Sequence, residues 1–329
     1  MGNSITPEIV IPNTALTNYK YNFLDDRIIY IDEMKGQSLY TRKVTNEDEL
    51  LLSNSHVSRF TPASTPSGRK LVYFMNGSDY NYIYVTPVDK YDPKLYVQQR
   101  CTRLTYLDGN LFALEYAGYV IAQHPNVGGS FQLATQVGSQ IDFEFVHDNY
   151  LYYSSQGYLK RVELYRNTPP KQGIETGGYS HTYRKEGDKV YYFCNNSINV
   201  LDLKTLEYKK ITPDDLYVSS FDYEDGIFLV EIGQYQTDKK SFIMDEKFAS
   251  KVEIPDLKDT YHNTIHNGYV YYYKYPMTYR FKIPSFGLQA SVKYNGKSVS
   301  VEKIYSRING VGRNVIAGWT KKNGVLVKI

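Results

Sequence analysis

A turn rich in Gly, Asp or Asn, followed by a short run of apolar and aromatic residues, recurs eight times along the chain. The runs are spaced by about 41 residues on average, and they favour strands while lacking the periodicity of a helix. Their cores are residues 28–30, 71–73, 111–113, 151–153, 190–192, 227–229, 270–272 and 315–317. The pattern therefore predicts an all-β chain built from eight similar units.

Each unit before the eighth contains enough alternating and apolar sequence for four strands. In the seventh unit the expected strands are 261–265, 269–274, 278–283 and 288–294, and the turn Asn267-Gly268 between the first two is a strong hairpin signal. A period of 40–45 residues with four strands per repeat is typical of a β-propeller, with one blade per repeat. We therefore predict an all-β fold, a single β-propeller of four-stranded antiparallel blades.

The two ends of the chain predict how the ring closes. The eighth unit holds only three strands, whereas 8–11 is a spare apolar strand ahead of Pro12. We expect strand 8–11 to pair as the outer strand of the last blade, because this covers a bare sheet edge. Eight blades are favoured; seven is the alternative, since 61–67 in the second unit resembles a loop and the last unit is incomplete. The predicted domain is 1–329, with a lead-in at 1–18 and repeats near 19–55, 56–100, 101–139, 140–178, 179–216, 217–257, 258–300 and 301–329.

Composition narrows the class of protein. Hydrophobic residues make up 42% of the chain and charged residues 22%, as in globular domains, and a net charge of +3 without a basic block gives nucleic-acid binding little support. Cys101 and Cys194 stand in different repeats, which predicts two buried thiols. No secretory signal and no membrane span are predicted, so we expect a cytoplasmic protein or one incorporated into a particle such as a virion.

Several runs resemble those of a known family. Examples are Ile29-Tyr30-Ile31-Asp32, Leu151-Tyr152-Tyr153-Ser154 and Val190-Tyr191-Tyr192-Phe193, each followed by a short third strand. In these runs the chain resembles bacterial β-propellers related to the YWTD propellers of lipoprotein receptors. No repeat contains Tyr-Trp-Thr-Asp, and that family usually has six blades. The resemblance implies the fold and a tendency towards non-enzymatic binding; the identity of a ligand does not carry over.

The sequence lacks a recognisable catalytic or metal motif. His262 and His266 fall on an expected strand and its turn, roughly 13 Å apart at ~3.3 Å per residue, which is too far to share a metal ion. No nucleophile elbow, phosphate-binding loop or calcium loop is present. We predict no catalytic residue, no metal site and no cofactor.

The candidate ligand-binding residues lie in the loops between the second and third strand of each unit. In a propeller these loops gather on one face, where Tyr rings can stack while amide and carboxylate groups orient a partner. The candidates are Asp79, Tyr80, Tyr116, Gln156, Gln234, Tyr235 and Tyr275.

These features favour a non-catalytic binding or assembly module with a protein or glycan partner. A structural or receptor-binding component of a phage or other large particle is one setting compatible with the sequence. The alternative is a carbohydrate-active enzyme with its site at the central channel, where two carboxyl groups would stand roughly 5–10 Å apart.

Overall fold

The computed structural model divides the chain into two compact units, the propeller unit (residues 1–283) and the C-terminal unit (residues 284–329). It describes residues 6–328 except 46–47, 55, 124–129, 138–140, 165–173, 175, 235–237, 255–256, 258–259, 285–289, 295–296, 302–318 and 323–324. Each unit is described by itself.

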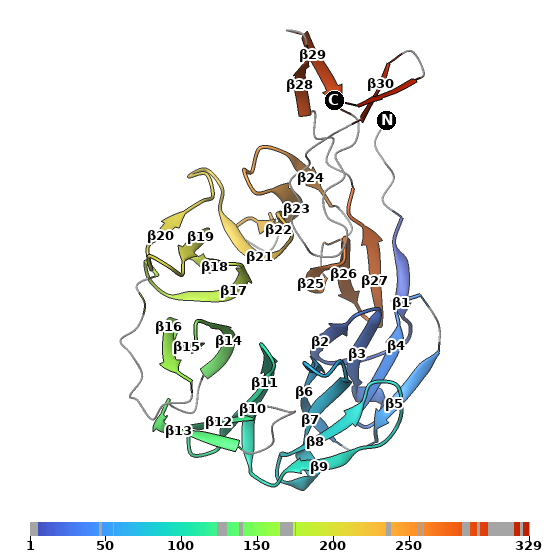
Figure 1. Ribbon diagram of the computed structural model, residues 1–329. Coiled ribbons are helices and arrows are strands. Elements are labelled where there is room, and N and C mark those ends of the chain that lie inside the picture. The colour runs from blue at the N-terminus through green and yellow to red at the C-terminus, as the bar shows by residue number, and fades with distance from the viewer. Residues whose placement is uncertain are drawn as a thin grey trace. The chain divides into compact units, whose positions relative to one another are not determined.

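Seven antiparallel sheets are the blades of the propeller unit (Figure 1). Blade 1 contains β2 (Leu16–Leu24), β3 (Arg27–Asp32), β4 (Ser38–Lys43) and β5 (Glu49–Ser53). Blade 2 contains β6 (Val57–Ser64), β7 (Lys70–Asn76), β8 (Tyr82–Pro87) and β9 (Lys94–Val97). Blade 3 contains β10 (Cys101–Leu107), β11 (Asn110–Glu115), β12 (Tyr119–Gln123) and β13 (Ser130–Gln136). Blade 4 contains β14 (Ile141–His147), β15 (Tyr150–Ser155) and β16 (Tyr158–Glu163) within the described residues.

The second half of the ring follows the same plan. Blade 5 contains β17 (Ser180–Glu186), β18 (Lys189–Cys194), β19 (Ser197–Asp202) and β20 (Tyr208–Lys210), and blade 6 contains β21 (Val218–Glu224), β22 (Ile227–Ile232), β23 (Lys240–Asp245) and β24 (Lys251–Glu253). Blade 7 joins β25 (Tyr261–His266), β26 (Tyr269–Lys274) and β27 (Met277–Lys282) to β1 (Glu8–Ile11).

The first strand of each blade is the innermost one, and it contacts the first strand of the neighbouring blades at most of the joints around the ring (Figure 1). The predicted hairpin turns between first and second strands are confirmed. Asp225, Asn267 and Gly268 take φ angles of 50°, 51° and 77°, which suit tight turns.

The core lies between successive blades, because the second strands are apolar on both faces. Phe112 and Leu114 of blade 3, for example, pack with Leu151 and Tyr153 of blade 4, and all four are at most 1% exposed. Burying one such side chain stabilises the fold by about 1.5–3 kcal/mol. Each blade therefore depends on its neighbours.

A backbone hydrogen bond recurs between blades. An amide near the start of a new blade donates to a carbonyl in the loop between the second and third strands of the preceding blade. The pairs are Val57 N to Gln37 O (3.0 Å), Cys101 N to Asn81 O (3.4 Å), Val137 N to Gly118 O (3.0 Å), Ser180 N to Gly157 O (2.7 Å) and Val218 N to Asn196 O (2.9 Å). All five acceptor residues have positive φ angles. These inter-blade bonds hold the loops in place.

Ring closure uses the N-terminal strand, as predicted, although in a different blade. β1 pairs antiparallel with β27, with Glu8 opposite Arg280, and the Arg280 guanidinium donates to the Glu8 carboxylate at 2.9 Å. Val10 and Ile11 are 2% and 0% exposed. Thr14 N donates to Pro276 O at 2.8 Å, so an inter-blade bond also spans the closure.

The favoured prediction of eight blades is wrong, because the propeller has seven. The outer position of blade 7, which the sequence assigned to 288–294, is taken by β1. In the C-terminal unit β28 (Ala290–Tyr294) pairs instead with β29 (Lys297–Val301), and β30 (Trp319–Lys322) pairs with β31 (Val325–Lys328). The expected strand core 315–317 lies outside the described residues.

The second unit is a regular four-stranded blade, although its loop-like segment was one of the two reasons for considering seven blades. Residues 61–64 continue β6 and pair with β7, so the predicted loop is shorter than 61–67. Thr61 is 5% exposed, and its hydroxyl accepts from Tyr106 N of blade 3 at 3.1 Å. This buried hydrogen bond joins blades 2 and 3.

The prediction of two buried thiols is confirmed. Cys101 and Cys194 are free and buried. Burial, together with the charge of Glu115, raises the pKa of Cys101 to about 12, which keeps this thiol protonated and unreactive at neutral pH.

Candidate binding surfaces

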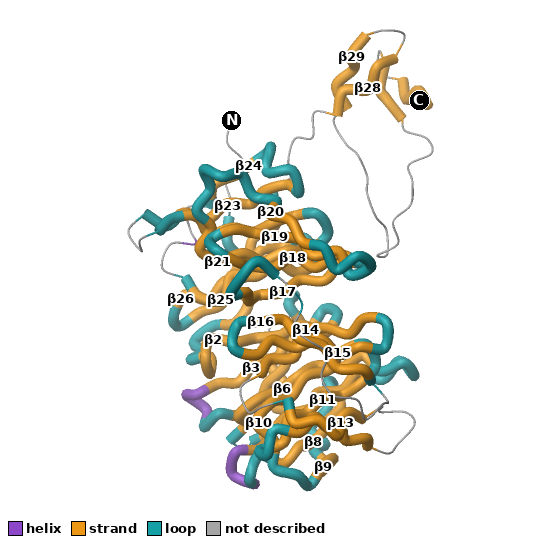
Figure 2. Tube along the Cα trace, turned by 90° about the vertical axis from the view of Figure 1, so that its left-hand side faces the viewer, coloured by secondary structure: helices purple, strands orange, loops and turns teal. Residues whose placement is uncertain are grey.

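The loops between second and third strands and the connections between blades lie on one face of the ring, because the strands of each blade alternate in direction. We call this the loop face. Figure 2 shows two of its short turns, η1 (Glu33–Lys35) and η2 (Gly77–Asp79), on the same side of the molecule. The inter-blade hydrogen bonds end at this face, so its backbone is held at several points.

The structure places most of the predicted ligand-binding residues on the loop face, in five different blades. Tyr80, Tyr116 and Tyr275 are 70%, 64% and 68% exposed. Gln156 and Gln234 are also exposed, whereas Asp79 is partly buried. Tyr235 lies outside the described residues. The residues share a face without converging on one pocket, and whether they bind a ligand stays a prediction.

Two of these residues have partners that restrict them. The Asp79 carboxylate accepts a hydrogen bond from the Tyr84 hydroxyl, and this bond raises the pKa of Tyr84. The guanidinium of Arg100 lies over the Tyr116 ring, 4.3 Å from its centroid, and Tyr116 N donates to Arg100 O at 3.1 Å. Asp79 therefore supports its loop, while Tyr116 presents a ring that a cation already covers on one side.

Other exposed residues with large hydrophobic side chains lie on this face and were not among the predicted candidates. Met34 is 66% exposed, Tyr158 55% and Tyr179 64%. Tyr179 lies against Gly157, where a Cβ atom would come within 2.0 Å of the ring, and the φ angle of Gly157 is +80°. Its position in the sequence could have identified Tyr179, because it lies in the connection between blades 4 and 5 and such connections belong to the same face.

The innermost strands carry a second group of polar residues. The Asp222 carboxylate is 5% exposed; it accepts from Arg184 of blade 5, from the Thr264 hydroxyl and from Ile265 N of blade 7. Arg103 of blade 3 donates to Asp142 of blade 4 at 3.0 Å. These bonds connect neighbouring blades and satisfy the carboxylates, which indicates a structural role.

Glu144, on the innermost strand of blade 4, is an acid whose pKa is strongly raised. Burial raises the pKa of Glu144 to about 7, and the charge of Asp142 acts in the same direction. A hydrogen bond from the Ser154 hydroxyl at 2.5 Å acts in the opposite direction. This carboxyl therefore exchanges its proton near neutral pH.

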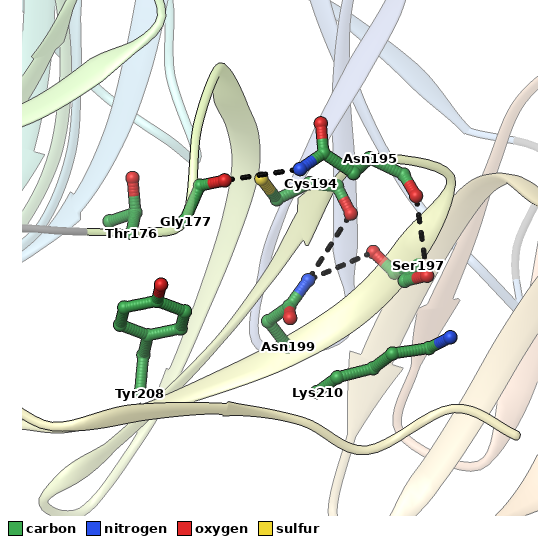
Figure 3. A pocket seen from close by; sticks show the side chains of 8 residues that line it. All are labelled: Thr176, Gly177, Cys194, Asn195, Ser197, Asn199, Tyr208 and Lys210. Carbon is green, nitrogen blue, oxygen red and sulfur yellow. Dashed lines mark hydrogen bonds between the residues drawn. The ribbon is translucent and has the colours of Figure 1, made fainter. Parts of the chain in front are cut away.

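A cavity of about 270 Å³ lies on blade 5 (Figure 3). It is lined by Thr176, Gly177, Cys194, Asn195, Ser197, Asn199, Tyr208 and Lys210. No residue of this cavity was a predicted candidate. Asn199 and Tyr208 belong to different strands, β19 and β20, and only their pairing brings the two side chains to one site.

In the described part of the chain, no group of three or more His, Cys, Asp or Glu side chains could hold a metal ion, and no helix there is long and apolar enough to cross a membrane. His266 ends β25 and stacks on Phe23 with ring centroids 4.1 Å apart; burial lowers its pKa. The side chain of His262 is not among those that the structure describes.

Comparison with known proteins supports the fold. No protein-family model matches the chain, and no curated protein matches it in sequence. It is similar to the WD40 β-propeller domain of Doa1, with a TM-score of 0.54 and 11% identity over 85% of this chain and 98% of that chain. It is also similar to YCF48 bound to D1 peptide (0.57, 9% identity, 87% and 98%) and to selenomethionine-substituted virginiamycin B lyase from Staphylococcus aureus (0.58, 10% identity, 85% and 99%).

At such low identity these likenesses show the fold alone. They confirm the β-propeller prediction. The more specific relation to YWTD-type propellers stays a prediction.

Proposed function

We propose that the protein is a non-catalytic binding module that docks a protein partner on its loop face. One observation carries the proposal: Tyr80, Tyr116, Tyr179 and Tyr275, from four places around the ring, are each at least 64% exposed on the same face. Exposed Tyr is enriched at protein interfaces, where it contributes a large contact area at a low cost in side-chain entropy.

The scaffold suits such docking. Inter-blade hydrogen bonds restrain the loops, so little backbone ordering has to accompany binding. The charges of the chain are nearly balanced, with 38 basic and 35 acidic residues, so the tyrosines rather than a charged field would select the partner. The similar propeller YCF48 was solved with a peptide, a precedent for peptide binding on this fold.

The alternative, a carbohydrate-active enzyme, needs two carboxyl groups at one cavity. Asp222 and Glu231 both line a cavity of about 310 Å³ beside blades 6 and 7. Both carboxylates are already engaged: Asp222 pairs with Arg184, and Glu231 pairs with Lys239 at 2.7 Å. A general acid and a nucleophile need carboxyl groups free to meet substrate, so we favour binding over hydrolysis.

A cytoplasmic location, or incorporation into a phage or another large particle, stays a prediction from the sequence.

A displayed library of random peptides, selected on the immobilised protein, tests the proposal. Selected peptides should bind the native chain, and Tyr80→Ala, Tyr116→Ala and Tyr275→Ala should each weaken binding by about tenfold where the ring is a hot spot. Tyr91→Ala is the matched control, because Tyr91 is 49% exposed but lies in the loop between β8 and β9, which belongs to the opposite face.

Failure to select any peptide, or selected peptides that bind all three variants as tightly as the native chain, would refute loop-face docking. A parallel panel of glycoside substrates tests the alternative. Turnover abolished by Asp222→Asn in a folded variant would replace the binding proposal with hydrolysis.

A further inference from the structure

The blade 5 cavity differs from the loop-face tyrosines in being concave and in having several polar side chains in its lining (Figure 3). It lies beside β19 and β20 on one side and residues 176–177 on the other. Its volume of about 270 Å³ is just below the range of ~300–1,000 Å³ for sites of drug-sized ligands. A ligand of one ring would fill it.

Two oxygen acceptors of the cavity are oriented by the protein. The Asn199 carboxamide is 7% exposed, and its Nδ2 donates to Cys194 O at 3.2 Å and to Ser197 O at 3.4 Å. Its Oδ1 is therefore turned away from these carbonyls, as Figure 3 shows. The Ser197 hydroxyl donates to Asn195 O at 3.3 Å, which leaves its oxygen lone pairs to accept. Both groups favour a ligand that donates hydrogen bonds.

Tyr208 supplies an aromatic surface at the edge of the same cavity. It is 41% exposed on the short strand β20, and its ring lies beside Gly177. A Cβ atom at Gly177 would approach the ring to 2.8 Å, and the φ angle there is +78°. The absence of a side chain at Gly177 leaves room for the Tyr208 ring. The exposed part of the ring can stack on an apolar ligand surface.

Charge limits the class of ligand. Lys210 borders the cavity and pairs with Asp214 at 2.6 Å, so the cation is largely compensated. With its charge compensated, Lys210 offers little attraction to a charged ligand, and an anionic ligand would also meet the acceptor oxygens of Asn199 and Ser197. A neutral ligand with several hydroxyl donors and a face of C–H groups satisfies all these groups.

We propose that the blade 5 cavity binds a single neutral pyranose ring, with its C–H face on Tyr208 and its hydroxyls donating to Asn199 and Ser197. The site shares no residue with the loop-face tyrosines, and it goes beyond the proposed protein docking. The sugar can be free or the end of a glycan chain.

Saturation-transfer difference NMR with the intact protein tests the site. The probes are methyl pyranosides of glucose, galactose, mannose and N-acetylglucosamine, with glucuronate and glucosamine as charged comparators. We expect at least one neutral pyranoside to receive saturation at its ring C–H protons and the charged sugars to bind more weakly. Tyr208→Ala should weaken the neutral sugar by about tenfold, whereas Tyr208→Phe keeps the ring and the affinity.

Tyr91→Ala is the control for loss of an exposed tyrosine elsewhere, and thermal melts confirm that each variant is folded. A glycan array that presents the same sugars at the ends of chains distinguishes a free sugar from a glycan as the ligand. Binding of either one supports the site if Tyr208→Ala weakens it. Absence of saturation transfer to every neutral pyranoside, or binding unchanged by Tyr208→Ala, would overturn it. Peptide binding to the loop face is measured with Tyr208 intact, so the two proposals fail independently.

Discussion

Ile11→Ala should destabilise the propeller because it removes a wholly buried side chain from the closing strand. Ile11 is 0% exposed and packs in a cluster that includes Leu16, Tyr30 and Tyr273, joining blades 7 and 1. Truncating a buried Ile to Ala typically costs about 2–5 kcal/mol. At ~2–4 °C per kcal/mol for a protein of this size, the melting midpoint should fall by roughly 4–20 °C.

Ile9→Ala is the matched control, since Ile9 lies two positions away on the same strand and is 55% exposed. Its unfolding free energy should change by no more than ~0.5 kcal/mol. Differential scanning calorimetry and urea titration measure both variants. Equal midpoints for Ile11→Ala and the native chain, or equal losses for the two variants, would refute the reasoning that β1 is buried as an integral strand.

Three further outcomes follow from particular contacts. Deleting 284–329 should leave the propeller's midpoint in calorimetry unchanged, because every blade is built from residues before 284; loss of the cooperative transition would contradict this. Gly157→Ala should lower the free energy of unfolding, measured by urea titration, by at least ~1–2 kcal/mol because the φ angle at this position is positive. Adding Tyr179→Ala should restore only the part of the loss that comes from the clash with the ring, and full restoration would argue against backbone strain. Glu144 has a pKa of about 7 against 4.5 for the unconstrained side chain, so the folded state holds the proton more tightly and stability should decline as pH rises from about 4.5 to 7. Glu144→Gln should reduce this decline, measured by urea titration from pH 4 to 8, and an unaltered pH profile would show that Glu144 does not cause it.

Local sequence patterns predict the hairpins well, and the blade count poorly, for one physical reason. β28 pairs with β29 and β30 pairs with β31, both antiparallel, so the predicted eighth unit 301–329 does contain paired strands. Membership of the ring depends on pairing between residues distant in sequence, such as Glu8 with Arg280. The apolar character of 8–11 identified a closing strand, but the local sequence does not indicate which blade that strand completes.

The candidate surfaces show the same division. Counting strands placed Tyr80, Tyr116 and Tyr275 on one face, because chain direction alternates regularly within a blade. The position of Tyr179 over Gly157 and of Tyr208 beside Gly177 depends on contacts between segments that are not adjacent in sequence. The blade 5 cavity arises from the register of β19 with β20, in which Asn199 lies opposite Lys210. Such registers cannot be read from composition or spacing.

Disulfide trapping tests the central claim, a closed seven-bladed ring in which β1 completes the blade of β25 to β27. Ile9 and Tyr279 are direct partners in the antiparallel register, within the separation that a disulfide normally bridges. The double variant Ile9→Cys with Tyr279→Cys should form this bond on mild oxidation, identified by peptide mapping, while Cys101 and Cys194 stay free. Ile9→Cys with Lys328→Cys represents the eight-bladed alternative. A bond between positions 9 and 328, with none between 9 and 279, would contradict the seven-bladed ring.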